Sequence, residues 1–144
     1  VEFFYKLLPY IQKFSFVEEP LIYYIQRETS IVNKQDGRTS HIFIVLDNVI
    51  KYYKDKGLYE LYKDEIEYTY TRLLLCSSLK RILQISDKAV KEKMLIETWE
   101  NLNMKFPNWK KNKILNQNKT VNGIFMRTVN NMTYKLYTKV LGVL

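Results

Sequence analysis

The sequence predicts a mainly α protein, a bundle of about four to five helices with a short two-stranded β element near the N-terminus. Only 4 Gly and 3 Pro occur in 144 residues, so few residues interrupt long helices. From about residue 41 onward, apolar residues recur at the spacing of one helix face. A composition of 47% hydrophobic and 15% aromatic residues indicates a folded chain with a core rather than a disordered one.

Residues 1–37 have a mixed character and are expected to form a segment of their own. Residues 2–13 have the apolar spacing of a short helix, which Pro9 should end or kink because proline lacks the amide donor. The stretches 14–17 and 21–26 are rich in β-branched and aromatic residues. They are therefore predicted to be two short strands.

Residues 38–106 are expected to form a helical domain. Its apolar spacing predicts helices over residues 41–54, 59–84 and 88–104. Ser40 is placed to cap the first of these, and Gly57 to end it. Either Ser86 or Asp87 should cap the third helix, because both types of side chain can accept a backbone hydrogen bond there.

Residues 107–144 are expected to form a basic C-terminal helical segment, with a Lys- and Asn-rich turn followed by one helix over about 122–142. The apolar positions of that helix are Val121, Phe125, Val129, Met132, Leu136 and Val140, flanked by Ile124 and Leu141. The net charge is +8, and residues 105–144 account for all of it, since they carry 8 Lys and Arg and no Asp or Glu.

A cationic helix with an apolar face is typical of helices that lie on an anionic membrane surface. The candidate residues for a membrane or partner surface are Lys110, Lys111, Lys113, Arg127, Lys135 and Lys139. Docking of this helix on its own domain or on a second copy of the chain is the alternative, as is a tail that only increases solubility. Nucleic-acid binding through the tail is the less favoured alternative.

Few residues in this sequence have reactive side chains at an informative spacing. One His and one Cys exclude a zinc site built from these residues, and a single Cys excludes an internal disulfide. His41 follows a helix start and Cys76 lies in an apolar run, so both are interpreted as structural. Asp64, Glu65 and Glu67 are interpreted as a solvated helix face. The tyrosines that alternate with lysines are explained more simply by helix interfaces than by a nucleic-acid platform.

Three stretches of the first 31 residues carry a family resemblance. They are EFFYKLLPY at 2–10, FVEEPLIYY at 16–24 and QRETSI at 26–31. Together they resemble the end of the catalytic domain of a bacterial family-2 glycosyltransferase, of the kind that builds capsular or exopolysaccharide. FPNWKK at 106–111 is similar to the C-terminal extension of the same group.

The resemblance implies that residues 1–37 are the C-terminal remnant of a GT-A-like catalytic domain. The parent enzyme would transfer a sugar, with inversion, from a nucleotide-sugar to a polysaccharide or lipid-linked acceptor. Its general base would be the Asp of a Glu-Asp pair placed immediately before Val1, so no catalytic residue is expected within this chain and the chain alone is expected to be inactive. The parent would use Mg²⁺ or Mn²⁺, and would act in the cytoplasm or on the inner face of the cell membrane.

The same resemblance implies three substrate-binding residues, Gln26, Arg27 and Ser30, on the loop that approaches the diphosphate. The planar guanidinium of Arg27 suits phosphate oxygens. A surface ion pair with Glu18 or Glu28 is an equal alternative for it. The other class of function, which does not depend on the resemblance, is a stand-alone helical module that binds another protein.

Overall fold

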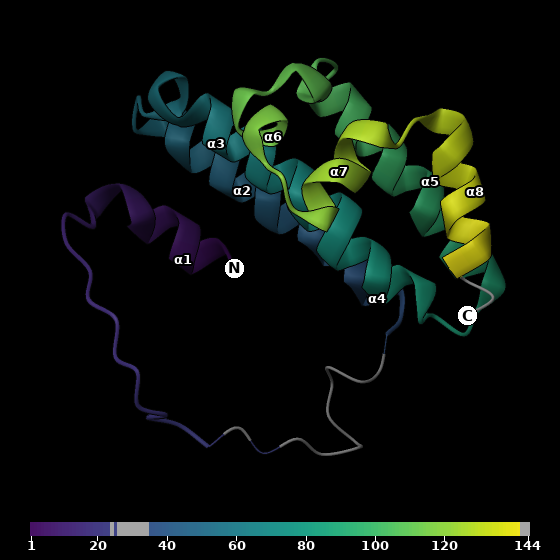
Figure 1. Cartoon of the computed structure of the whole chain (residues 1–144), viewed down its shortest axis with the longest axis horizontal. Helices are drawn as coiled ribbons and strands as arrows, with labels where there is room; N and C mark the ends of the chain where they lie inside the picture. Colours follow the sequence, from purple (N-terminus) through teal and green to yellow (C-terminus); the bar gives the residue numbers. More distant parts are fainter. Residues whose placement is uncertain (24, 26–34, 142–144) are drawn as a thin grey trace.

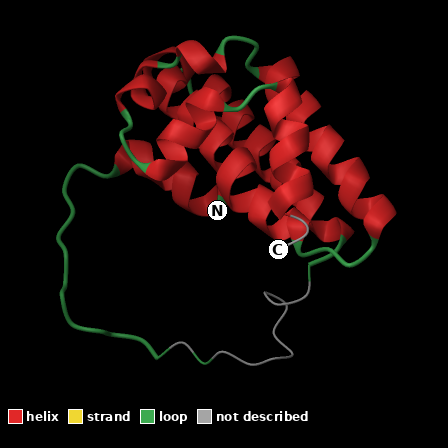
Figure 2. Ribbon diagram, turned by 45° about the vertical axis from the view of Figure 1, so that its right-hand side comes forward, coloured by secondary structure: helices red, strands yellow, loops and turns green. Residues whose placement is uncertain are grey.

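The computed structural model describes residues 1–23, 25 and 35–141. Within these residues every regular element is a helix (Figure 2), which confirms the prediction of a mainly α protein. Helix α1 (Glu2–Leu7) opens the chain, a long arc of chain follows, and the remaining helices pack together as a bundle (Figure 1).

The bundle contains α2 (His41–Asp55), α3 (Tyr59–Arg72), α4 (Leu79–Leu83), α5 (Lys88–Lys105), α6 (Lys113–Gln117), α7 (Val121–Thr128) and α8 (Asn131–Leu141). Short 3₁₀ turns occur at Leu8–Tyr10, Gly37–Ser40 and Trp109–Lys111, and a π-helical segment, Leu73–Ser78, joins α3 to α4. These two helices and the π-helical segment form the single long helix that the sequence predicts over residues 59–84.

Helix α1 packs against α2 and is closed by proline as predicted. The α-helical turns end at Leu7, and the 3₁₀ turn Leu8–Tyr10 carries Pro9 in its first turn. The Tyr53 hydroxyl of α2 donates a hydrogen bond of 2.8 Å to the Tyr5 carbonyl. This contact ties the first helix to the bundle although more than thirty residues of chain separate them.

The two expected strands are not formed among the described residues. Residues 14–17 run as chain without regular structure, and so does the described part of 21–26; residues 24 and 26 lie outside the described residues. A strand needs a neighbouring edge to satisfy its amide and carbonyl groups. No such edge lies beside this arc of chain in the view of Figure 1.

The helix ends follow local sequence signals in most places. Gly57 has a φ of +68° after α2, the left-handed conformation expected of a C-terminal glycine. Asp87, not Ser86, caps α5, since its carboxylate accepts a 3.0 Å hydrogen bond from the Val90 amide. Ser40 occupies the N-cap position of α2 as predicted, but its side chain accepts no capping hydrogen bond and instead donates to the Gly37 carbonyl.

The last predicted helix is two helices. Helix α7 ends at Thr128 and α8 starts at Asn131. The Asn130 side chain accepts hydrogen bonds from the amides of Met132 and Thr133, at 3.0 and 2.9 Å, while the Thr133 hydroxyl accepts one from the Asn130 amide at 2.7 Å. This reciprocal cap starts a new helix where the apolar spacing alone suggests a continuous one.

The core joins the early and late parts of the bundle in one cluster. Its fully buried members include Tyr70, Leu74, Leu75, Leu102, Trp109, Leu115, Met126 and Val129. Leu74 and Leu75 are both buried, so the middle of the long helix is enclosed on several sides. Cys76 is buried there too, and burial raises the pKa of its thiol, as expected of a structural cysteine.

Candidate functional site

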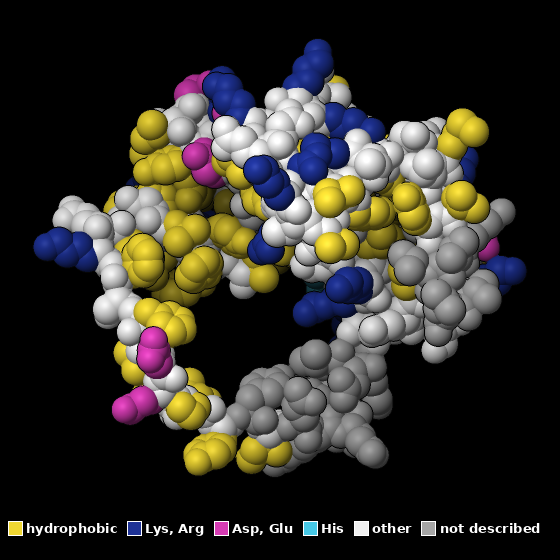
Figure 3. All heavy atoms as spheres, in the orientation of Figure 1, with side chains coloured by type: hydrophobic (Ala, Val, Ile, Leu, Met, Phe, Trp, Pro, Cys, Tyr) yellow, Lys and Arg dark blue, Asp and Glu magenta, His cyan; other side chains and the backbone are white. Residues whose placement is uncertain are grey.

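The segment formed by residues 11–23 and 25, called here the N-terminal arm, exposes large apolar side chains. Phe14, Phe16 and Tyr23 are 94%, 86% and 99% exposed. The arm leaves the bundle as a separate arc, with hydrophobic side chains along it in Figure 3. Large apolar groups in water are unfavourable, and a contiguous set of them marks a surface that another structure covers.

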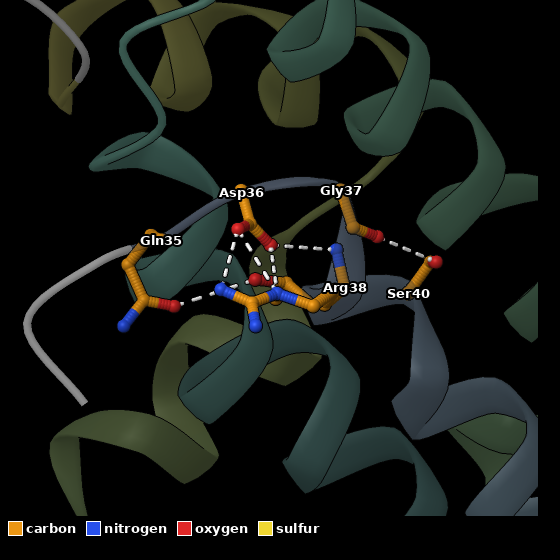
Figure 4. Close-up of polar contacts among 6 residues, drawn as sticks. Gln35, Asp36, Gly37, Arg38 and Ser40 are labelled. Carbon is orange, nitrogen blue, oxygen red and sulfur yellow. Dashed lines mark hydrogen bonds and ion pairs between the residues drawn. The ribbon is translucent and has the colours of Figure 1, made fainter. Parts of the chain in front are cut away.

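The three substrate-binding candidates, Gln26, Arg27 and Ser30, lie outside the described residues. Residues 35–40, the first described residues after them, form the junction with α2, and their polar contacts are drawn in Figure 4.

At this junction Asp36 and Arg38 bind each other. The Asp36 carboxylate accepts hydrogen bonds from the Arg38 amide at 2.9 Å and from the Arg38 Nε at 3.0 Å (Figure 4). These hydrogen bonds lower the pKa of Asp36 below its usual value. The Thr39 hydroxyl adds a 3.3 Å hydrogen bond to the Gln35 side chain, and the Ser40 hydroxyl donates to the Gly37 carbonyl. The Arg38 guanidinium therefore stabilises the turn that leads into α2.

The six candidates for a membrane or partner surface divide into groups. Four of them, Lys110, Lys111, Lys113 and Lys135, have exposed side chains. The side chain of Lys139 lies outside the described residues.

Arg127 differs from the other five candidates because it has a structural role. Its guanidinium donates hydrogen bonds to the carbonyls of Leu115 and Asn118 and so connects α7 to the end of α6. The same helices approach closely at Gly123, where a Cβ atom would lie 2.4 Å from the Asn118 carbonyl oxygen. Arg127 is therefore partly withdrawn from the surface on which the sequence places it.

The predicted apolar stripe of the last helix is only partly buried. Val129 is fully buried and Phe125 is half-buried, and Met126, which the predicted stripe does not include, is fully buried as well. Val121, Ile124, Met132 and Leu136 are exposed. The turn at Asn130 separates α8 from α7, so Met132 and Leu136 do not continue the buried face that ends at Val129, whereas Val121 and Ile124 are exposed on α7 itself.

A small cavity lies between α1, α2 and α3. Its volume is about 210 Å³, and its lining includes Tyr5, Leu8, Leu46, Tyr53, Tyr62 and Tyr70. Burial raises the pKa of the Tyr53 hydroxyl to about 12. The lining is apolar or tyrosine except at Glu65 and Thr69, so the cavity offers packing rather than acid-base chemistry.

A wider groove of about 850 Å³ runs between α5 and α8. Its lining includes Trp99 and Tyr134, whose rings stack with centroids 4.8 Å apart. The charged residues of the lining are Lys88, Lys91, Glu92, Glu100 and Lys135. The Tyr134 hydroxyl donates to the Leu95 carbonyl at 2.9 Å. These contacts connect the two helices.

The acidic residues of α3 contact the chain itself. Glu67 and the Asp64 carbonyl both accept hydrogen bonds of 2.8 Å from the side-chain amide of Asn112, a buried residue that begins α6. Among the described residues no group of three or more His, Cys, Asp or Glu is placed to hold a metal ion. Sequence reasoning missed the role of Asn112, although an Asn before a short apolar run is an ordinary helix-capping signal.

No family model matches this sequence, and comparison with curated proteins and with solved structures finds no match either. In the part of the chain that the structure describes, no helix combines the length and the apolar character needed to cross a bilayer.

Proposed function

We propose that this chain is the helical C-terminal part of a bacterial family-2 glycosyltransferase that moves a sugar from a nucleotide-sugar to a polysaccharide or lipid-linked acceptor. The observation that carries the proposal is the N-terminal arm. Its Phe14, Phe16 and Tyr23 side chains are almost fully exposed while the bundle encloses its own core. In the proposal the catalytic domain covers this arm, and residues 14–17 and 21–26 pair as strands with its sheet.

The proposed chemistry divides between the catalytic domain and this chain. The transfer needs a carboxylate that removes the acceptor proton and positive groups that stabilise the leaving diphosphate. The base, the nucleotide-binding strands and the Mg²⁺ or Mn²⁺ site belong to the catalytic domain. Gln26, Arg27 and Ser30 would contact the diphosphate from the loop between the arm and the bundle. Arg38 is not assigned to this contact, because Asp36 binds its guanidinium.

The first test is the sequence encoded directly before Val1. The proposal requires an Asp one residue upstream with a Glu before it, within a longer reading frame. A start codon at or near Val1 would contradict it.

The second test measures transfer or hydrolysis by the parent enzyme with a panel of nucleotide-sugars and Mg²⁺ or Mn²⁺. The parent should be active and the isolated chain inactive. In the parent, Arg27→Ala should lower kcat/KM about tenfold or more, because a charge-assisted contact to the diphosphate is lost. Arg81→Ala, an exposed position on α4, is the matched control and should leave kcat/KM unchanged. A parent inactive with every donor, or equal effects of the two substitutions, would refute the assignment.

A stand-alone helical interaction module is the alternative. The observation that favours it is the closed core, which runs from Leu46 in α2 to Tyr134 in α8. Under this alternative the arm binds a separate partner protein, and the reading frame starts near Val1. The upstream sequence therefore separates the two proposals directly.

A further inference from the structure

The outer face of α7 and α8 combines exposed apolar side chains with lysines. Val121, Ile124, Met132 and Leu136 are 82%, 50%, 83% and 60% exposed. Val121 and Ile124 are three residues apart and Met132 and Leu136 four apart, so each pair lies on one face of its helix. These four residues are called here the α7–α8 face.

The two helices present this face side by side. The rings of Phe125 in α7 and Tyr137 in α8 meet edge to face, with centroids 5.5 Å apart. In Figure 3 hydrophobic side chains are visible over both helices, in the same view as the lysines and arginines around α6. The apolar residues of the two helices therefore form neighbouring parts of one surface.

Helices α6, α7 and α8 carry positive charge and no carboxylate, while Glu92 and Glu100 of the neighbouring α5 line the groove beside Lys135. Residues 105–141 contain no Asp or Glu. Lys113 opens α6, Lys119 precedes α7 and Lys135 lies on α8, and all three side chains are exposed. A surface of this charge is complementary to an anionic partner.

We propose that the α7–α8 face docks on an anionic lipid bilayer. The exposed apolar side chains enter the boundary between headgroups and acyl chains, and Lys113, Lys119 and Lys135 bind the lipid phosphates. Arg127 takes no part in this contact, because the carbonyls of α6 hold its guanidinium. The docking is peripheral, through two short helices that lie in the plane of the interface.

The apolar component distinguishes a bilayer from a nucleic acid. Phosphate backbones are bound by positive charge, and single-stranded bases by stacking on aromatic rings. The four most exposed apolar residues of these helices are aliphatic or Met, which match acyl chains better than bases. Tyr137 is 38% exposed, and its ring packs edge to face on Phe125. The inference is independent of the proposed transferase role, since it rests on the charge and exposure of this face alone.

Vesicle flotation of the full chain tests the proposal without any nucleotide-sugar. The chain should float with vesicles of phosphatidylcholine that contain about one third phosphatidylglycerol. Its binding to vesicles of phosphatidylcholine alone should be weaker by about tenfold or more. The double variant Met132→Ser with Leu136→Ser should bind the anionic vesicles about tenfold more weakly. Lys113→Glu with Lys119→Glu should weaken binding by a similar factor and reduce its salt dependence.

The matched control is Ile44→Ser with Leu61→Ser, which removes two exposed aliphatic side chains from α2 and α3. It should bind vesicles like the unmodified chain, and circular dichroism should show unchanged helix content for every variant. Equal loss in the control, equal binding to both vesicle types, or no binding would overturn the proposal. Tight binding to single-stranded RNA that Met132→Ser with Leu136→Ser leaves unchanged, without vesicle binding, would overturn the proposal and assign the surrounding lysines to nucleic acid instead.

Discussion

At the scale of single residues, three buried tyrosines hold the helices in register. The hydroxyls of Tyr53, Tyr70 and Tyr134 donate hydrogen bonds to the Tyr5 carbonyl, the Asn101 side chain and the Leu95 carbonyl. Each bond crosses from one helix to another, so it fixes both helices relative to each other. A phenolate can no longer donate this hydrogen bond, which makes the contacts sensitive to alkaline pH.

We therefore predict that the folded chain loses stability above about pH 10. Burial raises the pKa of Tyr53 to about 12 and raises the pKa values of Tyr70 and Tyr134 as well. An unfolded tyrosine ionises near its ordinary pKa of 10.0, so the unfolded state loses protons first as the pH rises. The stabilisation is complete below pH 10 and declines between pH 10 and about 12.

Urea unfolding at a series of pH values measures this decline, and ultraviolet absorbance reports tyrosinate formation. Tyr70→Phe removes one ionising group and should flatten the decline, whereas Tyr23→Phe, in the exposed arm, should not change it. A stability that is constant up to pH 12, or tyrosines that all ionise in one step near pH 10 before unfolding, would contradict the prediction.

At the scale of elements, the turn between α7 and α8 determines which residues reach the surface. Asn130 ends one helix and caps the next through its contacts with Met132 and Thr133. The buried Val129 fixes the turn to the core. The exposure of Met132 and Leu136 follows from this turn, because a continuous helix would rotate them differently.

Asn130→Ala should destabilise the chain by about 1 kcal/mol, since it removes the cap of α8. Helix content should fall slightly at the C-terminal end, and chemical unfolding should show a lower midpoint with an unchanged slope. Asn122→Ala is the matched control on an exposed position of α7, and its effect should stay within about 0.5 kcal/mol. Equal losses in the two variants would mean that Asn130 does not act as a cap.

Local signals explain which elements could be predicted from the sequence. Pro9, Gly57 and Asp87 act within one turn of their own backbone, and the ends of α1, α2 and α5 follow from them. The break at Asn130 was missed because the apolar spacing continues through it. Leu61 lies in the helix predicted over residues 59–84 and is exposed, because burial depends on which helix packs beside a residue, a tertiary property that periodicity does not contain.

At the scale of the whole molecule, the candidate surfaces depend on contacts that the sequence does not record. The lysines were found by counting charge, but the structural role of Arg127 depends on the carbonyls of Leu115 and Asn118. The apolar run of the arm was visible in the sequence, whereas its separation from the bundle was not. Strand propensity indicates that a segment can adopt an extended conformation. A strand forms only where the edge of another strand is available to pair with it.

The contrast between the exposed arm and the closed bundle makes a prediction about proteolysis. Chymotrypsin cleaves after aromatic residues, and Phe14, Phe16 and Tyr23 lie in exposed chain without regular structure. The first cuts should therefore fall in the arm, while Tyr70 and Trp109 in the core should be cut only on unfolding. Mass spectrometry of a time course identifies the sites, and the nicked product should keep its helical circular dichroism and unfold within a few degrees of the intact chain.

Cuts in α3 or α5 at the same rate as in the arm would mean that the bundle opens as readily as the arm, and would contradict the closed core.

The same digestion of the parent enzyme tests the proposed function. If the catalytic domain covers the arm as proposed, Phe14 and Phe16 should be protected there at least about tenfold, because their burial would remove them from the protease. Equal cleavage in the parent and in the isolated chain would show that the exposed apolar residues of the arm bind something other than that domain.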